Sequence, residues 1–163
     1  MIILGIDPGV ADLGYGLIDK TPNGKFVCLT YGSIKTPAKT DLATRLETLY
    51  LKLTEIIKKY KPEIAAVEDL FFSKNIKTAM AVGQARGIIL LALKQNNIPF
   101  NEFTPNQVKQ STTAYGGADK KQMQKMVKLL LNLKEIPQPD DAADALAIAI
   151  CAGGFCDFRL QEK

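Results

Sequence analysis

The sequence predicts an α/β fold, in which one mixed sheet of about five strands carries helices on both faces. Three observations support this prediction. The chain opens with a short, unbroken apolar run, as a buried strand does. Two further β-rich segments follow, joined by a turn signal. Beyond them, helical periodicity alternates with short apolar runs, an order typical of a mixed sheet between two helical layers.

The first four expected elements are three strands and a helix. Residues 1–6 are apolar apart from one glycine and predict a central strand buried on both faces. Residues 14–19 and 26–34 predict two more strands, and Thr21-Pro22-Asn23-Gly24 between them predicts a hairpin turn. Residues 41–60 predict a helix, because leucine and isoleucine recur every three or four positions.

Strands and helices alternate in the next part of the chain. Residues 63–68 predict a buried strand, residues 75–96 a long helix and residues 98–103 a short strand. The long helix contains small residues that permit close helix contact, at Ala79, Ala81, Gly83, Ala85 and Gly87. Their spacing does not identify the partner, and packing within the chain is the default interpretation.

Three helices complete the chain. Thr104 and Asp119 each precede a helix as its cap, and a glutamine three residues later completes a capping box in both cases. A proline at the first helical position strengthens the first of these starts. The last helix is expected to begin near Asp140, which we assign as its cap, and to end near Gly153-Gly154.

Composition limits the class of protein. The 163 residues fit one domain, residues 1–163, which is long enough to bury about 70% of its unfolded surface. Three cysteines without CxxC spacing argue against a zinc site or a disulfide framework, and favour the reducing cytoplasm. The absence of histidine excludes His-based acid–base catalysis. No apolar run reaches membrane-spanning length, so no membrane association is expected, and the net charge of +4 permits nucleic-acid binding.

Four acids stand at the ends of expected elements. Asp7 ends the first apolar run, and Glu68 ends the run of residues 64–67. Because sites in α/β sheets form beyond the carboxyl ends of strands, we expect these two carboxylates to lie together. Asp141 and Asp144 are three residues apart and share one face of the last helix, where the helix dipole favours their ionised form.

Clustered carboxylates are suitable ligands for hard divalent cations such as Mg²⁺. Because two such ions can promote hydrolysis of a phosphodiester, the four acids together predict a magnesium-dependent nuclease. The structural alternative is that Asp141 caps a helix and Asp7 starts a turn. That alternative is the better interpretation of any one acid, but it weakens for the set, because two independent apolar runs end in acids.

Aromatic and basic residues near these acids are candidate DNA contacts. Phe71 and Phe72 closely follow the acid at the end of the second run and precede Lys74, and aromatic side chains there would stack on bases or wedge between them. The alternative places them in the core under the long helix, and we favour it for at least one of the two. Lys109 and Lys120 near helix starts would hold phosphates, although solvated helix faces have the same appearance.

Taken together, the motifs resemble the RuvC-type Holliday-junction resolvases, in family order and over nearly the whole chain. The matching segments are Ile3-Leu4-Gly5-Ile6-Asp7-Pro8-Gly9, Gly14-Tyr15-Gly16, Val67-Glu68, Phe71, Lys74-Asn75, Gly83-Gln84-Ala85-Arg86-Gly87, Pro105-Asn106-Gln107-Val108-Lys109, Ala118-Asp119-Lys120 and Asp141-Ala142-Ala143-Asp144-Ala145-Leu146-Ala147. The resemblance implies an RNase H-like fold and a homodimer. It also implies symmetric nicking of two strands across a four-way DNA junction, in recombination and DNA repair.

The resemblance implies roles for individual residues. The family's catalytic, metal-binding acids match Asp7, Glu68, Asp141 and Asp144. Its aromatic residue at the opened junction centre matches Phe71, its basic residues near the scissile phosphate match Lys109 and Lys120, and we add Phe72 and Lys74 as candidate DNA contacts. The resemblance also implies a junction-binding protein and a branch-migration motor as bacterial partners. The metal is predicted from the four acids themselves, as Mg²⁺, two ions per site, with Mn²⁺ as the alternative. The chain places two extra acids, Asp69 and Asp140, beside members of the set.

Two other classes of function stay open. A binding module would hold junctions without cutting them, with the acids serving as caps, but intact acids at all four positions count against it. An enzyme of another class would be a related RNA nuclease or a hexokinase- or actin-like ATPase. The ATPase needs a second phosphate-binding glycine motif, which the chain lacks.

Overall fold

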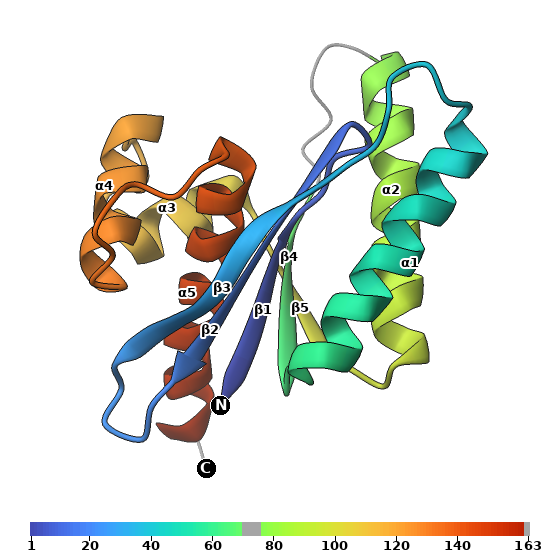
Figure 1. The fold of residues 1–163 in the computed structure, drawn as a ribbon. Helices are drawn as coiled ribbons and strands as arrows, with labels where there is room; N and C mark the ends of the chain where they lie inside the picture. Colours follow the sequence, from blue (N-terminus) through green and yellow to red (C-terminus); the bar gives the residue numbers. More distant parts are fainter. Residues whose placement is uncertain (70–75, 162–163) are drawn as a thin grey trace.

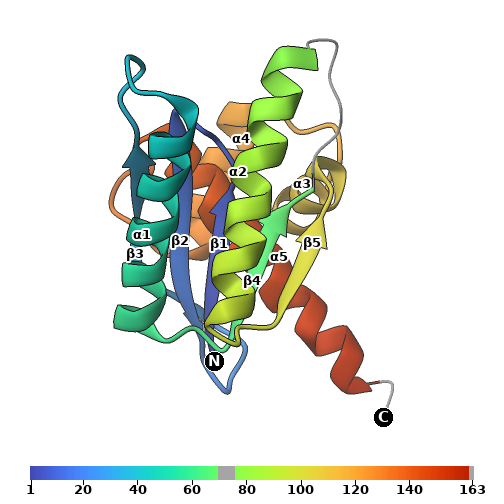
Figure 2. The same cartoon turned by 90° about the vertical axis from the view of Figure 1, so that its right-hand side faces the viewer.

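The computed structural model describes residues 1–69 and 76–161, and its centre is a five-stranded mixed sheet (Figure 1). The strands are β1 (Ile2–Asp7), β2 (Asp12–Lys20), β3 (Phe26–Lys35), β4 (Ile64–Glu68) and β5 (Phe100–Phe103). They lie in the order β3-β2-β1-β4-β5, which Figure 2 shows from one of the two helix-covered faces of the sheet. β1 pairs antiparallel with β2 and parallel with β4, so the expected mixed sheet is confirmed.

Helices cover both faces of this sheet, also as expected. The helices are α1 (Leu42–Tyr60), α2 (Ile76–Gln95), α3 (Pro105–Thr113), α4 (Lys120–Leu130) and α5 (Asp140–Gln161). In Figure 1, α1 and α2 lie on one face, while α5 lies on the other with α3 and α4 beside it. No helix in the described part of the chain is long and apolar enough to cross a lipid bilayer.

The central strand β1 is buried on both faces because its side chains alternate between two apolar clusters. Ile3 belongs to the cluster under α5, together with Ile18 and Leu146. Leu4 belongs to the opposite cluster, which α1 and α2 cover and which also includes Leu53. This double burial explains why the first run lacks the polar alternation of a half-exposed strand.

The helix starts follow the predicted capping chemistry with one exception. Both expected capping boxes are present, at Thr104 for α3 and at Asp119 for α4. The assignment of Asp140 as a cap is wrong. α5 does begin at Asp140, but the Asp140 carboxylate accepts a hydrogen bond from Gln124 Nε2 at 3.0 Å and pairs with Lys120 Nζ at 3.2 Å. Asp140 therefore joins α5 to α4.

The predicted end of the last helix is also wrong, because α5 continues through Gly153-Gly154 to Gln161. A β-carbon built on Gly153 would stand 2.4 Å from a ring carbon of Phe26 in β3. A glycine there serves close packing of the helix on the sheet, which the local sequence cannot distinguish from a helix stop.

Candidate active site

Three elements bring the four acids to one edge of the sheet. Asp7 is the last residue of β1 and Glu68 is the last residue of β4. Because β1 and β4 are adjacent and parallel, with Ile6 opposite Val67, their carboxyl ends meet. Asp141 and Asp144 occupy the first turns of α5, which packs along β1 and β2, and Asp141 lies against Gly14, the cross-strand partner of Asp7.

The approach of α5 to β1 depends on the absence of a side chain at Gly5. A β-carbon built on Gly5 would stand 2.0 Å from the backbone oxygen of Ala145 and 2.7 Å from the backbone nitrogen of Ala149. Any larger residue at this position would push α5 away from the strand. The contact fixes Asp144, the neighbour of Ala145, over the strand that ends in Asp7.

The carboxylates interact strongly with one another. Burial, followed by the charges of Glu68, Asp144 and Asp141, raises the pKa of Asp7 from 3.8 to about 8. Burial and then the charge of Asp144 raise the pKa of Glu68. Burial also raises the pKa of Asp144, although Lys120 opposes this shift. The folded protein therefore concentrates negative charge that a cation would stabilise.

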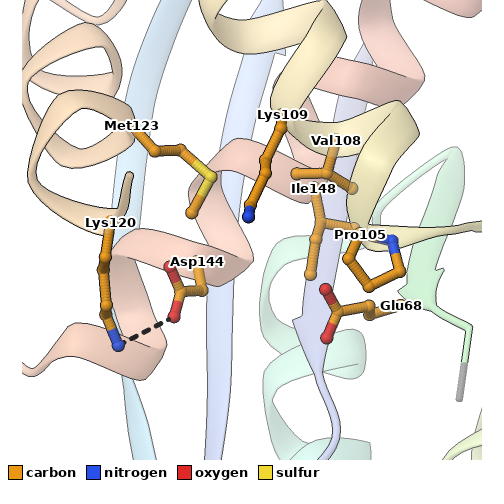
Figure 3. A pocket seen from close by; sticks show the side chains of 8 residues that line it. All are labelled: Glu68, Pro105, Val108, Lys109, Lys120, Met123, Asp144 and Ile148. Carbon is orange, nitrogen blue, oxygen red and sulfur yellow. Dashed lines mark ion pairs between the residues drawn. The ribbon is translucent and has the colours of Figure 1, made fainter. Parts of the chain in front are cut away.

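A cavity of about 250 Å³ opens beside these acids (Figure 3). It is lined by Glu68, Pro105, Val108, Lys109, Lys120, Met123, Asp144 and Ile148. Figure 3 shows Lys109 of α3 reaching between the two carboxylates and Lys120 of α4 paired with Asp144, where Nζ lies 3.3 Å from Oδ2. The two predicted phosphate-binding lysines thus lie beside two of the four acids.

The donor set suits a divalent cation. All four acids offer carboxylate oxygens, and the buried Oδ1 of Asp144 has no hydrogen-bond partner among the described residues. Within residues 1–69 and 76–161, no three acidic or cysteine side chains are close enough to hold an ion as they stand. Binding would therefore require the carboxylates to rotate inward and Lys120 to give up part of its contact with Asp144.

Three of the predicted DNA contacts, Phe71, Phe72 and Lys74, lie outside the described residues. The extra acid Asp69 lies just before them and faces away from the cavity toward α2. There it pairs with Arg86, whose Nη2 lies 3.5 Å from Asp69 Oδ1 and also binds Glu102 of β5. No local pattern in the sequence indicates this three-residue cluster, because its members come from three separate segments.

Comparison with known proteins gives matches over nearly the whole chain. A family described as "Crossover junction endodeoxyribonuclease RuvC" matches residues 3–152. The protein of that name from Halothermothrix orenii is 55% identical over 163 residues, covering 100% of this chain and 97% of the relative. The one from Moorella thermoacetica is 52% identical, with the same coverage of each chain.

Solved structures also resemble the fold of this chain over nearly its whole length. The structure described as "T. thermophilus RuvC in complex with Holliday junction substrate" has a TM-score of 0.89 and 32% identity, over 97% of this chain and 96% of that one. A Thermus thermophilus RuvC structure gives a TM-score of 0.90 at 34% identity, over 98% of this chain and 97% of that one. These matches confirm the RNase H-like architecture that the sequence motifs implied.

Proposed function

The chain belongs to the RuvC family of crossover junction endodeoxyribonucleases, and we propose that its acidic cavity cuts four-way (Holliday) DNA junctions during recombination and repair. Members of this family hydrolyse phosphodiester bonds in DNA. The observation that supports the proposal most directly is the cavity itself, where Lys109 and Lys120 lie beside Glu68 and Asp144. Carboxylates that hold cations and lysines that hold phosphate are the parts that phosphodiester hydrolysis needs.

The family is divalent-metal dependent, and we propose Mg²⁺, two ions per site, with Mn²⁺ as the alternative. The proposed ligands, which are also the catalytic acids, are Asp7, Glu68, Asp141 and Asp144. When bound, the cations supply activation of water and neutralisation of charge on the phosphate. Burial and the neighbouring carboxylates raise the pKa of Asp7 to about 8, so Asp7 is the acid that we propose both ions would share.

The remaining cavity residues position the DNA. Lys109 and Lys120 would bind oxygens of the scissile phosphate, because both line the cavity and they reach it from two separate helices, α3 and α4. Met123 and Ile148 add an apolar surface to the cavity, which strengthens charge interactions beside it. Phe71, Phe72 and Lys74 are proposed junction contacts on the sequence argument alone.

We further propose that two copies of the chain act together through α2. The helix exposes Met80 and Leu91, with exposed fractions of 64% and 46%. Between them, Gly83 and Gly87 are four residues apart, and nothing in the described part of the chain lies within 4 Å of a β-carbon built on either. The default expectation of packing within the chain holds for the buried Ala85 but not for these glycines. An open small-residue strip flanked by apolar side chains suits a second helix.

A homodimer would place one acidic cavity on each of two opposed strands, so that symmetric nicks leave ligatable 5′-phosphate and 3′-hydroxyl ends. By family membership, a junction-binding protein and a branch-migration motor are the proposed partners, and the cytoplasm is the proposed location. The unpaired thiols of Cys28 and Cys151 are consistent with a reducing compartment.

The test uses a synthetic four-way junction with Mg²⁺, beside a linear duplex and an RNA–DNA hybrid. Paired, ligatable nicks are expected on the junction alone. The Asp7→Asn variant is expected to bind the junction without cutting it. Junction binding without nicks by the unmodified protein would favour a binding module, and cutting of the hybrid would favour an RNA nuclease.

A further inference from the structure

Asp140 shares one lysine with the acidic cavity. The ammonium nitrogen of Lys120 lies 3.2 Å from Asp140 Oδ2 and 3.3 Å from Asp144 Oδ2. Asp144 is a proposed cation ligand and lines the cavity, whereas Asp140 does not line it. Lys120 therefore stands on the boundary of the site, held equally closely by a carboxylate of the site and by one outside it.

The carboxylate outside the site is fixed in place. Gln124 Nε2 donates a hydrogen bond to Asp140 Oδ1 at 3.0 Å, and Gln124 is only 8% exposed. Lys120 and Gln124 are four residues apart on α4, so they project from the same face of that helix toward Asp140. The Asp140 carboxylate at the start of α5 thus binds two side chains of α4, one through each of its oxygens.

A cation and Lys120 compete for Asp144. An ammonium group against Asp144 Oδ2 neutralises charge that a divalent cation would use, and it occupies space beside the ligand. Asp140 offers Lys120 a second carboxylate at the same distance, so Lys120 can give up Asp144 without losing an ionic partner. Without Asp140, the nearest remaining carboxylate for Lys120 is the one that the cation needs.

We propose that Asp140 is a positioning residue, which holds Lys120 at the rim of the cavity so that Asp144 is free to take a divalent cation. The inference deepens the proposed function and rests on it. It gives Asp140 a role through Lys120, and it requires no direct contact of Asp140 with the metal or with DNA.

The experiment measures Mn²⁺ binding to the full chain by the loss of the free-ion electron paramagnetic resonance signal, without DNA and without turnover. Asp140→Asn is expected to weaken Mn²⁺ binding about two- to fivefold, as expected for the competition of one partly exposed charge pair. Glu135→Gln removes an exposed acid near the same helix and is the matched control, with binding expected to stay unchanged.

A second pair of variants separates this role from a general effect of negative charge. The background variant is Lys120→Met, with Lys120→Gln as the substitute if it folds better. In that background, adding Asp140→Asn is expected to leave Mn²⁺ binding unchanged. Equal weakening with and without Lys120 would overturn the proposal, because Asp140 would then act by its own charge. Unchanged binding in the single Asp140→Asn variant would also overturn it.

The failure of this inference differs from the failure of the proposed function. If the unmodified chain binds Mn²⁺ and nicks the junction while Asp140→Asn binds Mn²⁺ equally well, only the role of Asp140 is lost. If the unmodified chain neither binds Mn²⁺ nor nicks the junction, the nuclease assignment itself fails.

Discussion

Gly14 lies directly beneath Asp141: a β-carbon built on Gly14 would stand 2.0 Å from the backbone carbonyl oxygen of Asp141. Gly14 is also the cross-strand partner of Asp7 in the pairing of β1 with β2. One residue without a side chain therefore fixes the separation between two of the four acids. Gly14 belongs to one of the family motifs in the sequence, and the structure shows that it serves the packing of α5.

Substitution of Gly14 by alanine is expected to disturb the site as well as the fold. The added methyl group must displace the first turn of α5, since the atom that it meets is backbone, and overpacking of this kind costs about 1–3 kcal/mol. We expect the nicking activity of this variant to fall much further than its fraction of folded protein does. Denaturant unfolding and junction nicking of the same preparation measure the two effects.

The matched control is Gly154→Ala, in α5 itself. Nothing in the described residues lies within 4 Å of a β-carbon at Gly154, so alanine there is expected to stabilise the helix by about 0.5–1 kcal/mol and leave nicking unchanged. Gly14→Ala with full activity would contradict the role given to this contact.

The raised pKa of Asp7 predicts a pH dependence of stability. The folded state holds a proton on Asp7 up to about pH 8, whereas an ordinary aspartate releases it near 3.8. Between these pH values the folded state therefore binds more protons than the unfolded state. The stabilisation that protonated Asp7 confers is complete below about pH 4 and is lost as the pH rises through about 8. The asparagine of the Asp7→Asn variant cannot ionise, so the melting temperature of this variant is expected to rise relative to that of the unmodified chain as the pH increases through this window.

Thermal unfolding with a chelator present, at intervals from pH 5 to pH 9, measures this difference. Addition of Mg²⁺ is expected to reduce it, because bound cations stabilise the ionised carboxylates. Parallel melting curves for the two proteins across the whole range would show that Asp7 is not the group that titrates.

Lys109 is expected to contribute one phosphate contact to junction binding. Its charge lies close enough to Glu68 to oppose the rise in the pKa of that carboxyl group. Lys109→Met should weaken binding of the junction and reduce the slope of log affinity against log salt by about one. Lys58→Met, an exposed lysine in the last turn of α1, is the control, and an equal change in both slopes would remove Lys109 from the interface.

The Arg86 cluster is expected to hold the end of β4 in place. Arg86 joins Asp69, the neighbour of Glu68, to Glu102 of β5. Arg86→Met should lower the free energy of unfolding by about 1–2 kcal/mol, between the values for exposed ion pairs and for charged hydrogen bonds. A double-mutant cycle with Asp69→Asn measures the coupling, and strictly additive effects would contradict the proposed connection.

The exposed strip on α2 is expected to hold two chains together. Leu91→Glu would place a charge on that strip, so the particle mass in sedimentation should fall to that of one chain, and paired cutting should give way to single nicks. Leu129→Glu on α4 replaces a more exposed leucine, at 69%, and should leave the mass unchanged. A single-chain mass for the unmodified protein at micromolar concentration would remove the dimer proposal.

Much of the fold was predictable because it depends on neighbouring residues. The unbroken run of β1, the spacing of α1 and the boxes at Thr104 and Asp119 each report local periodicity or local capping. The proximity of Asp7 and Glu68 was also predictable from the sequence. Both acids end strands, and the carboxyl ends of adjacent parallel strands lie side by side.

The errors arose where a local signal has two meanings. The pair Gly153-Gly154 looked like a helix stop, yet α5 continues because the glycine accommodates Phe26 of a distant strand. Asp140 looked like a cap, yet its carboxylate binds side chains of α4. In both cases the deciding partner is more than a dozen residues away in the sequence.

Local patterns along the chain were enough to predict the strands and helices, the acids at their ends, and the family that the motifs resemble. Three relationships appear only in the folded protein: Gly14 supports Asp141, Asp69 pairs with Arg86 away from the cavity, and Lys120 is shared by Asp140 and Asp144. The difference lies in how far apart in the sequence the interacting residues are. Periodicity and capping act over a few residues, whereas these contacts exist only after sheet order and helix packing have brought distant segments together.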